Sequence, residues 1–494
     1  MNSNKILKSD SEIRIESDVV GLLSEKQARY YRVVPIKWLE KKLHLACEQP
    51  PELNERAELR FLTGCQIDFS KYSVSEIEVA LNHAYQANRP PSRDKQFNIA
   101  RSKGNYQKQP EHGDVVSYVD WLIRSAIEAG ASDIHVEIDE EVFRIRLRLD
   151  GKLVEFDNPD CRPQSVISRL KIMSGLDIAE KRRPQDGRIR FEAGPRAVDI
   201  RVSTLPTDFG EKVVMRILDK SALNLSLESL QMQSALLNEL QQILKMPHGM
   251  ILVTGPTGSG KTTTLYSALN YLNRTESNII TIEDPIEYNL QGVNQTMVRA
   301  DIGLTFASVL RSVLRQDPNI IMLGEIRDAE TAEIAVRSAL TGHLVLSTLH
   351  TNDAASTIVR LIDMGIEPFL VAGAVRMILA QRLVRKICSA CREPDFAAKS
   401  ALSASLLSSL PSGITLFRGR GCNSCYHTGY SGRIAIFEPF IMTEALGDLI
   451  LNGGGLTELR NTLREQNSVN LRQSGLRHVA AGITTLEEVL TETV

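Results

Sequence analysis

A glycine-rich loop with one lysine is the first feature of this sequence that could do chemistry. The segment GPTGSGKT has the spacing G-x-x-x-x-G-K-T, with Gly255, Gly260, Lys261 and Thr262 at its fixed positions. In such a loop, successive backbone N–H groups curl around phosphate oxygens, the lysine reaches the β- and γ-phosphates, and the threonine hydroxyl ligates Mg²⁺. A β-branched apolar run precedes the loop and a helical pattern follows it. The segment therefore predicts a site for ATP and Mg²⁺.

The predicted nucleotide-binding residues form one continuous stretch of the chain. They are Gly255, Pro256, Thr257, Gly258, Ser259, Gly260, Lys261, Thr262 and Thr263.

A single glutamate and a cluster of three acidic residues, both downstream of the loop, could complete a hydrolytic site. Glu325 ends the segment NIIMLGE, an apolar run that by itself is typical of a buried strand. Because it follows the phosphate loop in a strand–helix pattern, we interpret Glu325 as the carboxylate that orients water beside Mg²⁺. The segment TIEDPIEY places Glu283, Asp284 and Glu287 within five positions. Uncompensated carboxylates repel one another, so this group either faces water or binds a cation, and we favour a role beside the metal–nucleotide complex.

Two histidines bracket a short apolar segment. His343 precedes Leu344–Thr348, and His350 follows it, next to Thr351 and Asn352. A lone histidine is more often structural, but a sensor of the γ-phosphate would be useful at such a strand end. We keep both histidines as candidate catalytic residues beside that structural alternative.

Four of the seven cysteines form two pairs, Cys388-x₂-Cys391 and Cys422-x₂-Cys425. Each C-x₂-C turn directs two thiolates at one point, and two such turns close a tetrahedral Zn²⁺ site with no open position. The gap between the pairs is longer than in a compact zinc ribbon, so it must contain an excursion, expected over Asp395–Leu410. Structural cysteines and a redox site are the alternatives to a structural Zn²⁺.

Composition sets the class of protein. At 494 residues the chain is expected to form several domains, and 43% hydrophobic and 24% charged residues are ordinary for a globular protein. The net charge of −2 gives no sign of a nucleic-acid surface. No segment is apolar enough for a membrane span, and the N-terminus lacks the apolar run of a signal peptide. We therefore expect a cytoplasmic protein.

The elements that must position these residues are expected in three stretches. In the first, Tyr31–Ile36 and Leu43–Cys47 read as strands and Glu52–Leu62 as a helix, followed by a second helix that Ser73 and Glu76 cap. Residues 87–113 are rich in Pro, Lys, Arg, Gln and Gly, a composition that cannot form a core and predicts a flexible linker.

The second stretch begins with an amphipathic helix over Val115–Ala129, whose expected apolar face is formed by Val116, Val119, Ile123 and Ile127. Strands follow at Val142–Leu149, which ends in an Asp150-Gly151 turn, at Val198–Val202 and at Lys212–Leu218.

The third stretch alternates strands with helices, which predicts an α/β core with a parallel sheet. Its expected strands are Met250–Thr254, Asn278–Ile282, Ile320–Leu323 and Leu344–Thr348, with a helix from Lys261.

Together these motifs resemble the secretion-superfamily ATPases, in particular the type II secretion ATPases (general secretion pathway protein E). The resemblance covers almost the whole chain. It is carried by GPTGSGKTTTLY (255–266), ITIEDPIEY (280–288), LRQDPNIIMLGEIRD (314–328), TGHLVLSTLHTN (341–352), EAGASDIHVE (128–137), LDIAEKRRPQDGR (176–188), RVSTLPTDFGEKVVMRIL (201–218), LAQRLVRKIC (379–388) and the four cysteines.

The resemblance implies a fold of several parts. These are an N-terminal α/β docking domain (1–86), a linker (87–113), a PAS-like α/β domain (114–225), a RecA-like P-loop core (226–387), a zinc-binding insertion (388–430) and a C-terminal helical part (431–494). It also implies a homo-hexamer in which ATP lies between the PAS-like and RecA-like domains.

The resemblance also implies site residues that the chain pattern alone does not single out. Arg201 and Arg216 would approach the γ-phosphate, although from alternation alone both read as surface residues of strands. Arg311, Arg315 and Arg433 are further cations of such sites, with roles left open. The expected catalytic set is Glu325, Lys261, Glu283, Glu287, His343, His350, Arg201 and Arg216.

The implied partners are membrane-bound. Residues 1–86 would bind the cytoplasmic domain of an inner-membrane secretion component, and the motor would act on the inner-membrane platform of the machinery. The chain would then be cytoplasmic and peripherally attached to the inner membrane.

Sister functions and other classes remain as alternatives. Pilus assembly ATPases share nearly every motif, but LLSEKQARYYRVVPIKW (22–38) is more similar to the secretion branch. Lys212 stands where relatives often have arginine, so no role is assigned to it.

A RecA-like DNA translocase would need a basic channel and stacking aromatic residues, whereas aromatic residues make up only 5% of this chain. A scaffold without hydrolysis would need a damaged phosphate loop, and this one is intact. We therefore expect no nucleic-acid partner.

Overall fold

The computed structural model describes residues 15–16, 19–23, 25–39, 42–51, 53–87, 114–140, 142–157, 162–194, 196–218, 225–396 and 414–493. Apart from Ala87, which is helical, the predicted linker over 87–113 lies outside these residues, and so does most of the predicted excursion over Asp395–Leu410. The chain divides into two compact units. The first combines Met1–Gln96, Cys391–Arg420 and Gly475–Val494, and the second combines Phe97–Ala390 and Gly421–Ser474.

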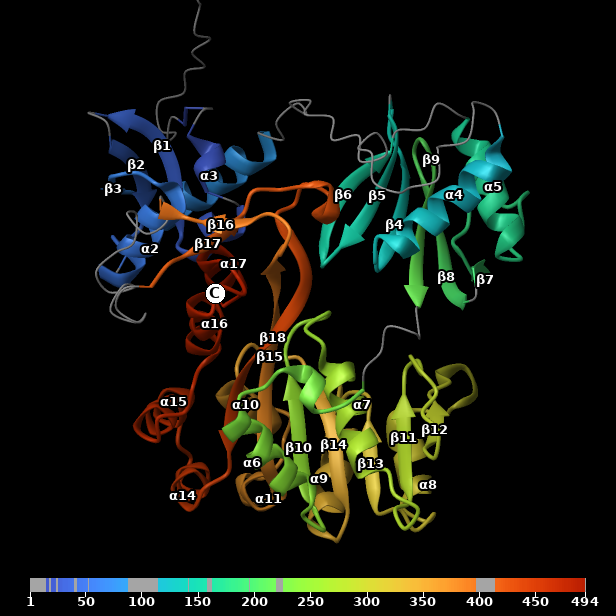
Figure 1. The fold of residues 1–494 in the computed structure, drawn as a ribbon. Coiled ribbons are helices and arrows are strands. Elements are labelled where there is room, and N and C mark those ends of the chain that lie inside the picture. Colours follow the sequence, from blue (N-terminus) through green and yellow to red (C-terminus); the bar gives the residue numbers. More distant parts are fainter. Residues whose placement is uncertain are drawn as a thin grey trace, which may run out of the picture. The chain divides into compact units, whose positions relative to one another are not determined.

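The first unit contains a small three-stranded sheet in the order β1-β2-β3, antiparallel and then parallel (Figure 1). Leu43, Leu45 and Ile77 are fully buried in its core. The predicted capping box is confirmed, since the Ser73 N–H donates to Glu76 Oε2 at 2.8 Å and the Glu76 N–H donates to Ser73 Oγ at 3.4 Å. The bounds of these elements are α1 (Glu25–Tyr30), β1 (Val33–Leu39), β2 (Lys42–Cys47), α2 (Leu53–Thr63), β3 (Ile67–Lys71) and α3 (Val74–Ala87).

Short elements from later in the chain also belong to the first unit, and α16 (Leu471–Ala480) begins in the second unit and ends in the first. Strands β16 (Arg392–Pro394) and β17 (Phe417–Gly419) pair antiparallel, and α17 (Leu486–Glu492) lies near the end of the chain.

The second unit begins with a six-stranded antiparallel sheet in the order β6-β5-β4-β9-β8-β7. Asp150 and Gly151 have φ of +49° and +89°, as the predicted tight turn between β5 and β6 requires. Helix α4 buries Val119 and Ile123 in the core, but Val116 is 47% exposed, so its predicted place on the apolar face is wrong. The bounds are α4 (Val115–Glu128), β4 (Asp133–Ile138), β5 (Phe143–Leu149), β6 (Lys152–Asp157), α5 (Pro163–Met173), β7 (Gln185–Ala193), β8 (Arg196–Thr207) and β9 (Gly210–Leu218).

A seven-stranded sheet in the order β12-β11-β13-β14-β10-β15-β18 forms the centre of the second unit (Figure 1). Neighbouring strands run parallel except β15 and β18, which pair antiparallel, so the predicted parallel sheet is confirmed apart from this edge. All residues of β10 and β14 are buried, as strands covered on both faces require. The bounds are β10 (Gly249–Thr254), β11 (Ile279–Glu283), β12 (Asn294–Met297), β13 (Ile320–Leu323), β14 (Leu344–Leu349), β15 (Val375–Ile387) and β18 (Tyr430–Ile441).

Helices connect the strands of this sheet, and several begin directly after a strand ends. Asp328 and Asp353 cap α9 and α10, where their side chains accept from the backbone N–H groups of Thr331 and Ser356. The helices of this part are α6 (Ser234–Leu244), α7 (Lys261–Leu272), α8 (Phe306–Val313), α9 (Ala329–Leu340), α10 (Ala354–Asp363), α11 (Pro368–Ala374), α14 (Glu444–Leu451) and α15 (Leu456–Glu465). Within the described part of the chain, no helix combines the length and apolarity of a membrane span.

Candidate nucleotide site and cysteine cluster

The phosphate loop joins β10 to α7 and depends on its glycines. Gly255, Gly258 and Gly260 have φ of +149°, +80° and +89°. A Cβ atom at Gly255 would lie 2.5 Å from the carbonyl oxygen of Gln381, and one at Gly260 would lie 2.7 Å from Gln381 Nε2. Side chains are therefore excluded where the loop needs bare backbone, and the first N–H groups of a helix such as α7 have no partner within the helix and can bind an anion. The loop has the form that a chain of phosphates requires.

Lys261 begins α7 and lies folded back on the loop. Its Nζ donates to the carbonyl oxygens of Gly255 at 2.8 Å and Pro256 at 3.0 Å. Burial lowers the pKa of Lys261 to about 8, the Glu325 carboxylate acts in the opposite direction, and the Arg382 guanidinium lowers it further. An anion that enters the loop would stabilise the charged form of Lys261 and raise its pKa.

Glu325 lies two residues beyond β13, at the same edge of the sheet as the phosphate loop. Its Oε1 accepts a short hydrogen bond from Arg327, and its Oε2 lies 3.3 Å from His350 Nε2. Burial raises the pKa of Glu325, but the hydrogen bond and charge of Arg327, with His350, outweigh burial and lower it overall. Glu325 is therefore held as a carboxylate, the form that can orient a water molecule.

The two candidate histidines lie at opposite ends of β14. His350 follows the strand and pairs with Glu325, whereas His343 precedes it and its Nδ1 lies 3.1 Å from the Ser338 carbonyl oxygen. A strand of six residues is about 20 Å long. The structure thus brings His350 to the phosphate-loop edge and does not bring His343 there.

The acidic segment after β11 is divided between three environments. Glu283 is buried and accepts from Tyr266, Thr281 and Gln295. Asp284 lies 3.7 Å from Arg327, and Glu287 lies 3.4 Å from Arg201. The three carboxylates therefore do not converge on one point.

The two arginines named by the resemblance lie on neighbouring strands but have different partners. Arg201 on β8 donates to the Ile286 carbonyl oxygen at 3.3 Å and pairs with Glu287. Arg216 on β9 donates through Nε to Asp133 at 2.9 Å, and its side chain is 61% exposed. Only Arg201 contacts the acidic segment.

The arginines with open roles lie elsewhere on the surface. Arg311 pairs with Glu330 at 2.5 Å, and Arg315 donates to the Arg311 carbonyl oxygen at 2.8 Å. Arg433 lies 4.0 Å from Asp150.

Three further residues at this edge had no role assigned from the sequence. Arg327, two positions after Glu325, holds that carboxylate. Gln381 on β15 accepts from the Thr264 hydroxyl at 2.7 Å, and Arg382 donates to the Asn352 carbonyl oxygen at 2.8 Å. Arg327 could have been found from the sequence, because a positively charged residue so close to Glu325 indicates a partner for its carboxylate. Gln381 and Arg382 reach the loop only because β15 pairs with β10, which no local pattern shows.

The four predicted metal ligands come together. The sulfur atoms of Cys388, Cys391, Cys422 and Cys425 all lie within 4.8 Å of one another, with Cys388–Cys422 at 3.9 Å and Cys422–Cys425 at 3.7 Å. Four thiolates at about 2.3 Å from a tetrahedral Zn²⁺ would be about 3.8 Å apart, so the cluster fits this ion. The N–H groups of Cys422 and Gly429 donate to Cys425 Sγ at 3.2 and 3.3 Å, a favourable environment for a thiolate.

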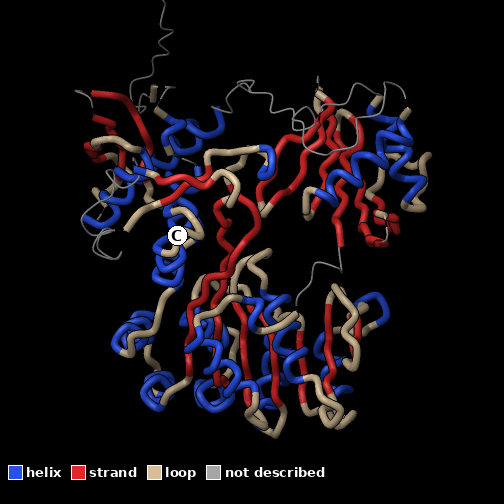
Figure 2. The backbone as a smooth tube through the Cα atoms, in the orientation of Figure 1, coloured by secondary structure: helices blue, strands red, loops and turns tan. Residues whose placement is uncertain are grey.

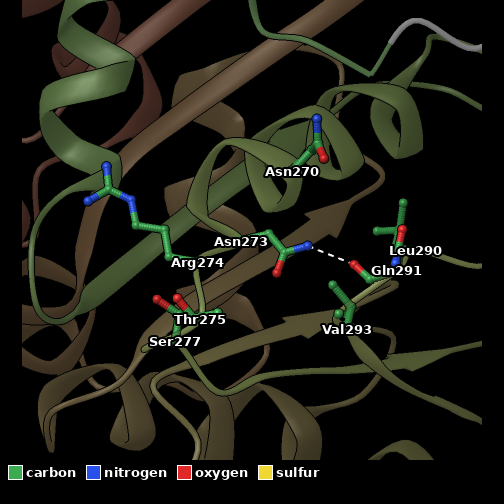
Figure 3. A pocket seen from close by; sticks show the side chains of 9 residues that line it. Asn270, Asn273, Arg274, Thr275, Ser277, Leu290, Gln291 and Val293 are labelled. Atoms are coloured by element: carbon green, nitrogen blue, oxygen red, sulfur yellow. Dashed lines mark hydrogen bonds between the residues drawn. The ribbon is translucent and has the colours of Figure 1, made fainter.

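A polar cavity of about 540 Å³ lies at the other end of α7 from the phosphate loop (Figure 3). It lies between the end of α7 and the segment before β12, where Asn273 Nδ2 donates to the Gln291 carbonyl oxygen at 2.7 Å. A helix of 12 residues is about 18 Å long, so this cavity is remote from Lys261. It is not part of the nucleotide site.

Comparison with known proteins identifies the family. The model of the type II/IV secretion system proteins matches residues 108–491, and that of the MshEN domain matches residues 7–90. The chain belongs to the type II/IV secretion ATPases. It is therefore an ATP-hydrolysing enzyme. The predicted RecA-like α/β fold agrees with this assignment.

Relatives come from both branches of the family. The type IV pilus assembly ATPase PilB of Myxococcus xanthus is 44% identical over 97% of this chain and 87% of its own length. The type II secretion system ATPase E of Vibrio cholerae is 45% identical over 85% of this chain and 86% of its own length. Among solved structures, the pilus retraction motor PilT with bound ADP is 28% identical, with a TM-score of 0.50 over 76% of this chain and 96% of that one.

Proposed function

We propose that this chain is the motor ATPase of a type II secretion system, which hydrolyses ATP to drive assembly of a pseudopilus and export of folded proteins. The observation that carries the proposal is the grouping of Lys261, Glu325 and His350 at one edge of the sheet in a member of this family. Assembly of a type IV pilus is the second candidate, because the PilB relative covers 97% of this chain.

Each residue of the site has a proposed task in ATP hydrolysis. The loop Gly255–Thr263 binds the phosphates, Lys261 turns from its two carbonyl partners to the β- and γ-phosphates, and the exposed Thr262 hydroxyl would hold Mg²⁺. When bound, Mg²⁺ would supply positive charge to stabilise the phosphate oxygens. Glu325 accepts a hydrogen bond from the attacking water, and His350 with Arg327 fixes the orientation of that carboxylate.

Arg201 is the arginine we assign to the completed site. It already contacts the acidic segment, while Arg216 must leave Asp133 before it can reach a phosphate. Arg201 would stabilise charge at the γ-phosphate within a homo-hexamer of the kind the family resemblance implies, and Arg216 is the second candidate for this role. The boundaries 114–225, 226–387, 388–430 and 431–494 remain our proposed division of the motor.

The cysteine cluster is proposed to bind one structural Zn²⁺. Four thiolates leave no open coordination position, so the ion would hold the 388–425 segment together and take no part in hydrolysis. Purified protein should contain one zinc per chain, and a strong chelator should unfold this segment before the ATPase core. A zinc content well below one ion per chain, in protein purified without any chelator, would contradict the assignment.

Residues 1–86 are proposed to dock the motor on the cytoplasmic domain of an inner-membrane secretion component. The MshEN match over residues 7–90 sets this region apart from the ATPase model, which begins at residue 108. The chain would then be cytoplasmic and held at the inner membrane by that partner, acting on the platform of the machinery. A chain that begins near Gly113 should bind ATP but no longer sediment with membranes that carry the machinery.

The test of the export function is complementation. In cells that lack their own secretion ATPase, the full chain should restore export of folded proteins, and the Glu325→Gln variant should not. Restoration of pili, but not of export, in matched strains would assign the chain to pilus assembly. Stimulation of hydrolysis by single-stranded DNA would instead favour a translocase, and we expect none.

A further inference from the structure

The carboxylate of Glu283 is enclosed by hydrogen-bond donors. Its side chain is at the end of β11 and only 3% exposed. Oε2 accepts from the Tyr266 hydroxyl, and Oε1 accepts from the Thr281 hydroxyl at 2.7 Å and from Gln295 Nε2 at 2.9 Å. A carboxylate offers about four acceptor positions, and three of them are occupied here. Little of this group is left to bind Mg²⁺ or water.

The sheet and α7 together build this enclosure. Thr281 and Glu283 are two residues apart on β11 and so share one face of the sheet, and Gln295 lies opposite Thr281 on β12. Tyr266 comes from α7 and is fully buried. Gln295 also donates through Nε2 to the Tyr288 carbonyl oxygen at 3.0 Å, so the same group holds the acidic segment.

Tyr266 contacts the acidic segment as well as Glu283. Its ring packs edge-on against Tyr288, with centroids 6.3 Å apart. Burial, then the hydrogen bond to Glu283 and its charge, raise the pKa of Tyr266, while backbone hydrogen bonds from Tyr288 and Glu287 act in the opposite direction. The hydroxyl is thus a neutral donor that lies between Glu283 and the backbone at Glu287 and Tyr288.

These contacts connect the phosphate loop to the acidic segment. Tyr266 is five residues after Lys261 on α7, about 7.5 Å along the helix axis. On the far side of the connection, Glu287 pairs with Arg201. A shift of α7 on nucleotide binding would therefore reach the segment Asp284–Tyr288 through a buried hydroxyl and a buried carboxylate.

We propose that Tyr266 is a positioning residue for ATP hydrolysis. With Glu283 it fixes the segment Asp284–Tyr288 against the helix that follows the phosphate loop, and Glu283 acts through this segment without contacting nucleotide. The proposal changes the role of Glu283 from the catalytic one expected from the sequence. It rests on ATP hydrolysis by this family, so hydrolysis by the unmodified chain is measured first and tests the function independently.

The test compares Tyr266→Phe, Glu283→Gln and the double variant in the full chain, with kcat, KM and the Kd of a fluorescent ATP analogue as readouts. We expect kcat to fall about tenfold in each single variant, the change expected when a hydrogen bond to a charged group is lost. The Kd should stay within about twofold, since the phosphate loop itself is intact. Because both variants break the same link, the double variant should be no slower than the slower single one.

Tyr271→Phe is the matched control, because it removes the same atom from a partly exposed tyrosine of the same helix. It should leave kcat unchanged. Thr281→Val removes another donor to Glu283 without a change of volume and should also lower kcat, which provides a second variant should Tyr266→Phe fold poorly. A roughly 10³-fold loss in Glu283→Gln with a normal rate in Tyr266→Phe would overturn the proposal and make Glu283 a catalytic residue. Losses that multiply in the double variant would also overturn it.

Discussion

The two ends of the seven-stranded sheet contain similar residues and differ in what those residues contact. At the carboxyl ends of the strands lie the phosphate loop, Glu325 and His350. At the amino ends lie His343, which contacts a backbone carbonyl, and Asn319, whose Oδ1 accepts from the Asn278 N–H at 2.8 Å. Residue type alone does not distinguish the candidate site residues from the structural ones, because histidine occurs in both sets. The two sets differ in the end of the strand at which their residues lie.

The difference has an electrostatic cause. At the carboxyl end, α7, α9 and α10 begin after β10, β13 and β14, so their unpaired N–H groups and positive dipole ends gather there. At the amino end the same sheet meets the ends of helices, where carbonyl groups point outward. An anionic substrate is stabilised at the first edge and repelled at the second.

The largest effect should come from a matched pair of changes at the two ends of β13. Glu325→Gln removes the charge that we propose orients water, and it should lower kcat roughly 10³-fold while ATP still binds. Asn319→Ala removes one backbone contact and should cost about 1 kcal/mol of stability, with kcat unchanged. Steady-state ATPase assays and thermal melts measure both. Equal losses of kcat would break the distinction between the two ends.

The two histidines of β14 test the same distinction with one residue type. His350→Asn removes the partner of Glu325 Oε2 and should lower kcat roughly tenfold. His343→Asn should leave kcat within about twofold, because its ring lies at the opposite end of the strand. A larger loss in His343→Asn than in His350→Asn would show that the site extends where the structure does not place it.

A smaller effect is expected in the number of protons that the protein takes up when it binds ATP. With a pKa of about 8, Lys261 is mostly neutral at pH 8.5, and the phosphates of ATP should raise its pKa again. Binding should then take up about 0.7 proton per ATP at this pH, and less at pH 7, where Lys261 is already charged. Calorimetry in buffers of different ionisation enthalpy measures this uptake. Lys261→Arg, which stays charged throughout, should abolish it.

The smallest effect should follow changes at the polar cavity between the end of α7 and the segment before β12. Arg274 lines this cavity beside Asn273, at the far end of α7 (Figure 3). Arg274→Ala should change neither the ATPase rate nor the Kd for ATP by more than about twofold, since about 18 Å of helix separates it from Lys261. A strong effect on ATP affinity would mean that nucleotide also contacts this end.

Much of the core could be predicted from the sequence because its signals are local. The strand Ile320–Leu323 has the predicted bounds, and the predicted start of α7 at Lys261 agrees with the structure. The four cysteines formed a cluster because the spacing of each pair already fixes the direction of its thiolates. In each case the residues that determine the element are its immediate neighbours.

What the sequence did not show depends on pairing between distant segments. Strand β3 and helix α1 have no strong periodic pattern and were not predicted, and the edge strand β18 joins the sheet only through β15. The burial of Glu283 is of the same kind, since its three partners come from α7, β11 and β12. An acidic cluster in sequence therefore gave no indication that one of its members is enclosed.

Strands β15 and β18 extend past the other strands of their sheet (Figure 2). Ala380 pairs with Thr254 directly before the phosphate loop, and Cys388 follows eight residues later. Eight residues of strand span about 26 Å, so a tilt of about 5° at the loop displaces the far end by ~2 Å. Cys388 follows β15 and Cys425 precedes β18 at this far end, so a Zn²⁺ ion bound by the cysteine cluster would hold the ends of the two strands together.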